Sequence, residues 1–266
     1  MKKFIFRTLS FLLILYVGAC TYMYFYQEDF IFHPKKLKHS SELHFSIPFQ
    51  EIKITAKGAI LNGALFKSKE SKGLIFFLHG NAGNLLNQDY AAKFYTKLGY
   101  DFFTFDYRGY GKSTNEISSE KEFFDDIQSA YNLVKKSYSE ELINVVGYSI
   151  GTAPAAMISS QNHPSKLLLI APYFSLLDMT VRRYKIIPTF LVEYKFETNK
   201  YLERIKSPVL LIHGDQDDIL PFDGSIQLSK LLNENSKFLP IKGQGHNNFE
   251  DNVIFQNKVS EFLKMH

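Results

Sequence analysis

A serine between two glycines is the first residue whose surroundings suggest chemistry. Ser149 lies in residues 145–151 (VVGYSIG), where a short β-branched run ends in Gly-x-Ser-x-Gly and an Ala-rich stretch follows. This order predicts a strand, a sharp turn and a helix, which would hold the serine hydroxyl above the edge of a sheet. Glycines are needed at the turn because a side chain there would strike the neighbouring strand or helix. Ser149 is therefore a candidate nucleophile.

Acidic residues follow a later apolar run. Residues 209–212 are continuously apolar, and the segment after them carries Asp215, Asp217 and Asp218. A carboxylate just past a strand end is well placed to orient a histidine. From their positions alone, all three aspartates are candidates.

A histidine follows near the end of the chain. His246 lies in the glycine-rich segment 243–248 (GQGHNN), after a predicted short strand at 237–241. Such a loop has the freedom to bring an imidazole back to Ser149. The order serine, acid, histidine is the one used by serine nucleophiles at the edge of an α/β sheet. The three signals together favour nucleophilic catalysis with His246 as the general base.

Two glycine-rich loops follow the predicted strands at 74–78 and 102–105. In residues 79–84 (HGNAGN), we expect the backbone N–H of Asn81, with Ala82 as the alternative, to bind a developing oxyanion together with the N–H of Ile150. The loop at 106–113 (DYRGYGKS) lacks the spacing of a phosphate-binding loop. We expect it to be structural, with Asp106 and Arg108 paired.

The pattern of apolar residues predicts the elements that hold these loops. Short continuous apolar runs at 74–78, 102–105, 142–146, 167–170 and 209–212 are typical of strands buried on both faces. Helical spacing lies between them, at 90–98 and 123–134, and a hairpin is predicted at 51–55 and 61–66. This alternation predicts a mainly parallel, doubly wound α/β sheet with helices on both faces and its functional loops at the carboxyl ends of the strands.

Composition narrows the possible functions. The chain has 266 residues, a formal net charge of +4 and scattered lysines, which favours one large domain and gives no sign of nucleic-acid binding. Cys20 is the single cysteine, so neither an intrachain disulfide nor a thiolate metal site can form. The eight histidines have no metal-binding spacing, and we expect neither a metal nor a cofactor.

The first 26 residues predict that the chain is attached to a membrane. Residues 8–26 are apolar over about the length of a bilayer span, and Lys2, Lys3 and Arg7 precede or begin the run. The positive-inside rule then predicts a single-pass anchor, a cytoplasmic start and an extracytoplasmic domain at 27–266. Two alternatives are a signal peptide with lipidation of Cys20 and a helix buried in the core. Residues 28–34 would pack the domain against its anchor, with a structural role for His33.

These motifs resemble those of the α/β-hydrolase superfamily. More narrowly, the chain is similar to single-pass, membrane-anchored α/β-hydrolase-domain proteins, which are often labelled serine aminopeptidase-like and some of which remove palmitate from proteins in animals. The resemblance is carried by residues 30–34 (FIFHP), 79–84, 106–111, 147–151, 213–217 and 245–247. In that family the acid lies in a His-Gly-x-x-Asp pattern, so the resemblance selects Asp217 and assigns nucleophile and base to Ser149 and His246. It also implies a small lid at about 172–207.

The function expected from the motifs and the resemblance is hydrolysis of carboxylic esters or thioesters through an acyl-enzyme. We expect most of the apolar lid to pack onto the domain; if part of it lines the site, its apolar side chains, with Arg182, Arg183 and Lys185, suit a lipid-like small molecule or an acylated protein. One alternative is an aminopeptidase-like enzyme, for which Glu193 or Glu197 could hold the substrate amine. Another alternative is a non-catalytic membrane scaffold with the same fold.

Overall fold

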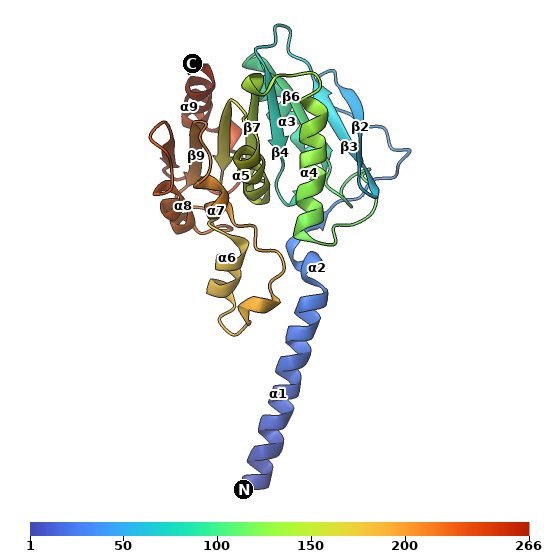
Figure 1. Ribbon diagram of the computed structural model, residues 1–266, viewed down its shortest axis with the longest axis vertical. Coiled ribbons are helices and arrows are strands. Elements are labelled where there is room, and N and C mark those ends of the chain that lie inside the picture. The colour runs from blue at the N-terminus through green and yellow to red at the C-terminus, as the bar shows by residue number, and fades with distance from the viewer. Residues whose placement is uncertain (266) are drawn as a thin grey trace.

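The computed structural model, which describes residues 1–265, has a long N-terminal helix projecting from an α/β body (Figure 1). The helix is α1 (Lys2–Phe25), and a short helix α2 (Gln27–Ile31) joins it to the body. No residue of α1 is buried, so the alternative of a core helix is wrong. Among the described residues, α1 is the one helix with the length and apolar composition needed to cross a membrane.

The body is built on an eight-stranded sheet in the order β10-β9-β8-β7-β4-β6-β3-β2. Its strands are β2 (Gln50–Ala56), β3 (Ala59–Phe66), β4 (Leu74–Leu78), β6 (Asp101–Phe105), β7 (Ile143–Tyr148), β8 (Lys166–Ile170), β9 (Val209–Gly214) and β10 (Lys237–Ile241). β3 is antiparallel to β2 and to β6, and the other neighbours are parallel. The predicted mainly parallel sheet and its hairpin are confirmed.

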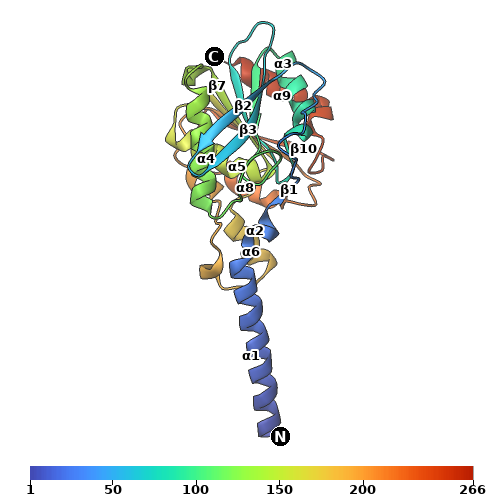
Figure 2. The same ribbon diagram turned by 90° about the vertical axis from the view of Figure 1, so that its right-hand side faces the viewer.

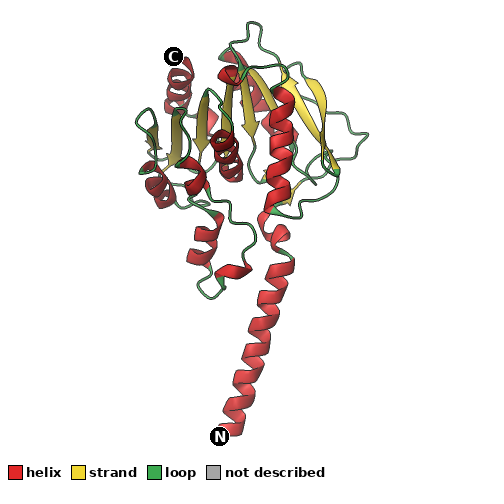
Figure 3. Cartoon of the chain, in the orientation of Figure 1, coloured by secondary structure: helices red, strands yellow, loops and turns green. Residues whose placement is uncertain are grey.

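Helices cover both faces of the sheet, as Figure 3 shows. The central strand explains this, because Leu74, Phe76 and Leu78 of β4 belong to one buried cluster and Ile75 and Phe77 to the other. Residues of α4 (Glu120–Val134) and α5 (Thr152–Gln161) complete the first cluster, and those of α3 (Asp89–Lys97) and α9 (Val253–Lys264) complete the second. A strand that is apolar at every position is therefore buried on both sides.

The remaining elements lie near the carboxyl ends of the parallel strands, except the 3-10 turn at Glu140–Leu142, which directly precedes β7 at the amino end. They are the two-residue strands β1 (His33–Pro34) and β5 (Ala82–Gly83), the helices α6 (Leu176–Arg183), α7 (Thr198–Leu202) and α8 (Phe222–Ser229), and short 3-10 turns at Leu85–Gln88, Glu140–Leu142, Ser149–Gly151, Thr189–Leu191 and Phe249–Asp251. α6 lies on the same side of the body as α1 in both views (Figures 1 and 2).

The chain that leaves α2 is tied to the loops at this edge. β1 pairs with β5 in the loop after β4, Lys35 N–H donates to Gly83 O at 3.0 Å, and Gly111 N–H donates to Lys35 O at 3.1 Å. Phe32, which is 6% exposed, packs against Phe123 and the aromatic residues Tyr194 and Phe196. The N-terminal helix therefore enters the body next to the loops that carry the candidate chemistry.

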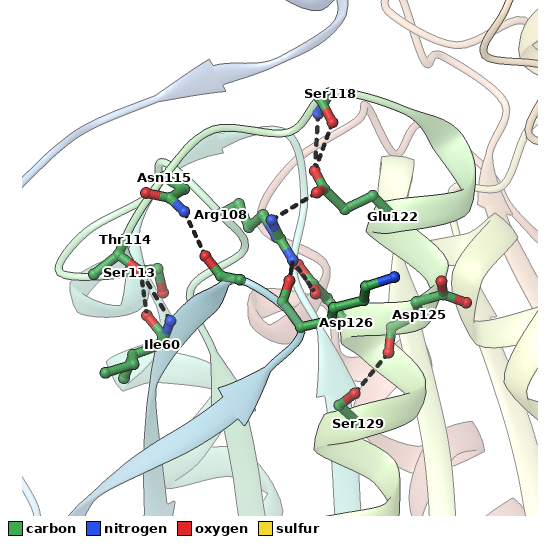
Figure 4. Close-up of polar contacts among 12 residues, drawn as sticks. Ile60, Arg108, Ser113, Thr114, Asn115, Ser118, Glu122, Asp125, Asp126 and Ser129 are labelled. Atoms are coloured by element: carbon green, nitrogen blue, oxygen red, sulfur yellow. Dashed lines mark hydrogen bonds and ion pairs between the residues drawn. The ribbon is translucent and has the colours of Figure 1, made fainter.

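Arg108 corrects one sequence-based expectation. It is not paired with Asp106: its guanidinium donates to Asp126 at 2.5 and 2.9 Å and to Glu122 at 2.7 Å, both on α4 (Figure 4). It also donates to Lys57 O at 2.5 Å, in the turn between β2 and β3. Arg108 therefore fastens α4 to the loop after β6 and to the hairpin.

Replacing Arg108 should destabilise the fold strongly. Arg108→Met would leave the buried Asp126 carboxylate without its partner, which costs about 3–5 kcal/mol when one member of a buried ion pair is removed. Urea unfolding followed by circular dichroism would measure the loss. Lys121→Met, which removes the exposed pair with Asp125, is the matched control and should have little effect. Equal losses in the two variants would contradict this role for Arg108.

Candidate active site

Ser149 occupies a strained turn between β7 and α5. Its φ of 54° lies in the left-handed region, which non-glycine residues rarely adopt. A Cβ at Gly147 would lie 2.5 Å from Gly151 O, and one at Gly151 would lie 2.2 Å from Leu78 O. The glycine spacing in the sequence is thus required by the close approach of β7, β4 and α5, and it lets the turn present the Ser149 side chain.

The structure brings Ser149, His246 and Asp217 into one hydrogen-bonded chain. His246 Nε2 lies 3.1 Å from Ser149 Oγ, and His246 Nδ1 lies 2.7 Å from Asp217 Oδ2. An ionised carboxylate can only accept, so the proton is on Nδ1 and Nε2 is free to accept the serine proton. The imidazole therefore has the tautomer that a general base for Ser149 requires.

Asp217 is held ionised by four donors. Its Oδ1 accepts the N–H groups of Ile219 at 2.9 Å and Leu220 at 2.8 Å, and its Oδ2 accepts from His246 and from His213 Nε2 at 2.9 Å. Burial alone would raise the pKa of Asp217, but the hydrogen bonds from His213, His246 and Leu220 outweigh it and lower the pKa well below its usual range. The carboxylate therefore remains charged and fixed beside the imidazole.

The two neighbouring aspartates have other surroundings. Asp215 accepts the N–H of Gly243 at 2.7 Å and so ties the loop after β9 to the loop that carries His246. Asp218 is exposed. Of the three carboxylates that follow β9, only Asp217 contacts His246.

Two positioning residues were missed in the sequence. His213, fully buried at the end of β9, contacts Asp217 through Nε2 and Ser225 Oγ through Nδ1 at 2.6 Å. Tyr148 donates its hydroxyl to His246 O at 2.9 Å and to Asn247 Oδ1 at 2.7 Å, which steadies the histidine loop. Two signals in the sequence could have found them: His213 is the histidine of the His-Gly-x-x-Asp pattern, and Tyr148 directly precedes Ser149.

The candidate oxyanion loop is braced from two sides. Asn81 Oδ1 accepts from His33 N–H at 3.3 Å and from Tyr110 Oη at 3.1 Å, and among the described residues Asn81 N–H has no acceptor. His79 is buried and donates from Nδ1 to Gly80 O at 2.7 Å, and burial lowers its pKa to about 4. His79 is therefore a neutral core residue that shapes the loop. His33 supports the same loop through its backbone.

A cavity of about 700 Å³ lies over Ser149 and His246. Its lining includes Asn81 and Ala82 of the oxyanion loop and the carboxylates Glu250 and Asp251. None of the residues 172–207 lines it, so the segment expected to be a lid does not cover the site in this conformation. A second cavity, of about 780 Å³, lies between the end of α1 and α4, away from the triad. Within residues 1–265 no cluster of three or more His, Cys, Asp and Glu side chains could hold a metal ion.

We expect Asp106, next to the oxyanion loop, to make the stability of the fold depend on pH. Burial raises its pKa to about 7, even though its Oδ1 accepts the N–H of Leu85 at 2.7 Å. Because the folded state favours the protonated form, its stabilising contribution is present below about pH 4 and is lost as the pH rises to about 7.

We expect Asp106→Asn to remove this dependence. At 1.36 kcal/mol per pKa unit, the wild type should lose at most about 4 kcal/mol relative to the variant across this pH window. Thermal unfolding of both proteins at a series of pH values measures the difference. Stability curves that run parallel from acid to neutral pH would contradict this interpretation of Asp106.

Comparisons with known proteins agree with this architecture. A family model described as the α/β hydrolase fold matches residues 73–185. The chain is 30% identical over 196 residues to the α/β hydrolase domain-containing protein aho-3 of Caenorhabditis elegans. The aligned residues are 72% of this chain and 57% of that protein. The chain is also 29% identical over 202 residues to human α/β hydrolase domain-containing protein 17C. This alignment covers 73% of this chain and 58% of that protein. The match thus spans less than two thirds of these relatives.

Solved structures show the same fold. The Pyrococcus furiosus esterase Pf2001 superimposes with a TM-score of 0.70 at 20% identity, covering 88% of this chain and 97% of the esterase. Est1E of Butyrivibrio proteoclasticus superimposes with a TM-score of 0.66 at 18% identity, covering 80% of this chain and 97% of that chain. The resemblance inferred from the motifs is confirmed by these comparisons.

Proposed function

Since the chain belongs to the α/β-hydrolase superfamily, we propose that it is a serine hydrolase that cleaves acyl esters or thioesters through Ser149, His246 and Asp217. The single observation that carries the proposal is the hydrogen-bonded chain from Asp217 through His246 to Ser149, at 2.7 and 3.1 Å. Serine, base and orienting acid in mutual contact are the arrangement required for nucleophilic catalysis.

The proposed reaction has two steps. His246 Nε2 removes the Ser149 proton as Oγ attacks the carbonyl carbon, and the imidazolium then donates that proton to the leaving group as the acyl-enzyme forms. Water, deprotonated by His246, attacks the acyl-enzyme; the bond from the acyl carbon to Ser149 Oγ breaks, the imidazolium returns the proton to Oγ, and the acid is released. The backbone N–H groups of Asn81 and Ile150 stabilise the oxyanion in both steps, each supplying about 3 kcal/mol.

The proposed substrate is an acyl chain joined to a polar group, in a lipid-like small molecule or an acylated protein. α1 supports attachment to a membrane, where such substrates are found, through an uncleaved anchor or alternatively a lipidated Cys20. The cationic residues Lys2, Lys3 and Arg7 favour a cytoplasmic start and an extracytoplasmic domain at 27–266. The relatives named α/β hydrolase domain-containing 17 support this branch.

One observation favours a second candidate, an aminopeptidase-like activity. Glu250 and Asp251 line the cavity over Ser149, so a carboxylate is available there for a substrate amine. Glu193 and Glu197, the carboxylates considered from the sequence, do not line it. A non-catalytic scaffold is disfavoured because all three members of the proposed triad are present and in contact.

A substrate screen separates the candidates. We expect the full chain to hydrolyse p-nitrophenyl acyl esters faster than aminoacyl anilides, because an ester needs no amine-binding group. Glu250→Gln should leave ester turnover nearly unchanged. Faster turnover of the anilides, together with its loss in Glu250→Gln, would replace the esterase proposal with the peptidase one.

A further inference from the structure

The segment from Tyr184 to Leu191, the lid tip, exposes apolar side chains that the body does not cover. Phe190 is 78% exposed, Ile186 is 74% exposed and Tyr184 is 51% exposed. Isolated exposed apolar residues are common, but three within seven positions at the tip of one projection mark a contact surface. Contact with an apolar partner would therefore stabilise the exposed side chains of the tip.

Contacts with the N-terminal helices identify where the tip lies. Tyr16 Oη on α1 donates to Ile186 O at 2.6 Å. Closer to the body, Gln27 joins the same segment twice, donating to Leu191 O at 2.8 Å and accepting from Glu193 N–H at 2.9 Å. Tyr194 Oη donates to Glu28 at 2.7 Å. The lid is therefore fastened to α1 at Tyr16 and to α2 at Gln27 and Glu28, and Figures 1 and 2 show the lid beside the part of α1 nearest the body.

The position of Tyr16 along α1 sets the depth of the tip. From Lys2 to Tyr16 the helix is about 21 Å long at 1.5 Å per residue. Entry of the lipid core at residue 8, the start of the predicted span, would put Tyr16 about 12 Å into a core of about 30 Å, close to its centre, whereas entry at Lys2 would end the core roughly 9 Å beyond Tyr16. Interfacial apolar elements reach depths of about 5–10 Å. Entry at Lys2 is the position that fits the contact between Tyr16 and Ile186, because irregular backbone is not tolerated at the centre of a bilayer, and this entry puts the tip at an interfacial depth.

The charge of the tip suits the same surface. Arg182 is engaged with Asp178 at 2.7 Å and with Asp223. Arg183 and Lys185 are exposed and form no ion pair with the residues that the structure describes. Apolar side chains beside unpaired cations are the composition of elements that lie in the interface of membranes with anionic lipids.

We propose that the lid tip is a second membrane-binding element, which inserts Ile186 and Phe190 into the bilayer surface that α1 enters. The carboxyl ends of the strands, and with them Ser149, then face the membrane, because β1 follows α2 directly and pairs with the oxyanion loop. Substrate reaches the site from the lipid surface. This inference rests on membrane attachment through α1, which is part of the proposed function.

The absence of tryptophan from the chain allows a direct test, since each introduced tryptophan is a unique fluorophore. The full chain is reconstituted into vesicles of phosphatidylcholine and phosphatidylglycerol, with and without lipids brominated either near the headgroup end or near the methyl end of their acyl chains. Phe190→Trp reports on the tip, Phe11→Trp on α1, and Leu142→Trp on the opposite edge of the sheet. Phe11 and Leu142 are both exposed, which makes them matched positions.

We expect bromine to quench Phe190→Trp and Phe11→Trp strongly and Leu142→Trp hardly at all. Quenching of Phe11→Trp alone would overturn the inference about the tip and leave membrane attachment intact. Quenching of neither would overturn both. Tryptophan quenching does not depend on catalysis, so none of these outcomes tests the proposed triad.

A second variant tests the consequence for substrate access. Ile186→Ser combined with Phe190→Ser should lower the hydrolysis of a long-chain ester carried in vesicles roughly tenfold, because the domain then sits less firmly on the lipid surface. Turnover of a short, water-soluble ester should remain that of the wild type. Equal rates on the vesicle-borne ester in both proteins would contradict delivery of substrate from the membrane.

Discussion

Ser149→Ala should reduce ester hydrolysis by at least about 10⁴-fold, because no other group in the site can form the acyl-enzyme. The fold should survive, since Ser149 Oγ contributes a single hydrogen bond, to His246. The strained φ of 54° belongs to the turn and is kept by alanine. Initial rates with a p-nitrophenyl ester, and thermal unfolding of the same samples, measure both parts of the prediction.

A serine outside the turn provides the matched control. Among the described residues, Ser160 on α5 bonds to Met157 O alone, so Ser160→Ala should keep wild-type kcat. Substantial turnover by Ser149→Ala, with the fold intact, would remove Ser149 from the mechanism.

Asp217→Asn should lower kcat by about 10⁴-fold while leaving ester binding little changed. An amide at this position can donate to His246 Nδ1, which would move the imidazole proton to Nε2 and leave no acceptor for the Ser149 proton. Asp217 also accepts from His213 and from two backbone N–H groups, so a moderate loss of stability accompanies the change. Steady-state kinetics that separate kcat from KM measure the effect.

The neighbouring aspartates are built-in controls for that experiment. Asp218→Asn, at an exposed position, should have wild-type kcat. Asp215→Asn loosens the contact to Gly243 N–H and should cost far less than Asp217→Asn. A loss at Asp215 or Asp218 that equals the loss at Asp217 would mean that the wrong carboxylate has been assigned.

The sequence predicted the sheet and the turn at Ser149 because both depend on local patterns. An apolar run such as 74–78 can only be buried on two faces, and glycine is the residue that fits where Gly147 and Gly151 approach backbone. Local patterns could not decide among Asp215, Asp217 and Asp218. That choice depends on the path of the loop after β9, where the N–H groups of Ile219 and Leu220 turn toward Asp217.

Contacts between distant segments were beyond local reasoning. Arg108 is paired with Glu122 and Asp126, which lie in the first and second turns of α4, because α4 packs across the hairpin at that point. Most of the segment 172–207 was expected to pack onto the domain, and the contact of its tip with Tyr16 of α1 was not foreseen. Both contacts depend on how complete helices and loops pack against one another, and the spacing of residues along the chain does not encode this packing.

Mass spectrometry of the protein after reaction with a fluorophosphonate tests the central claim most directly. The reagent phosphonylates a serine only where a general base removes its proton, so it reads out the relay from Asp217 through His246 to Ser149. We expect one adduct, on the peptide that contains Ser149, and none in His246→Ala. An adduct on a different residue, or equal labelling of Ser149 in His246→Ala, would contradict hydrolysis by this triad.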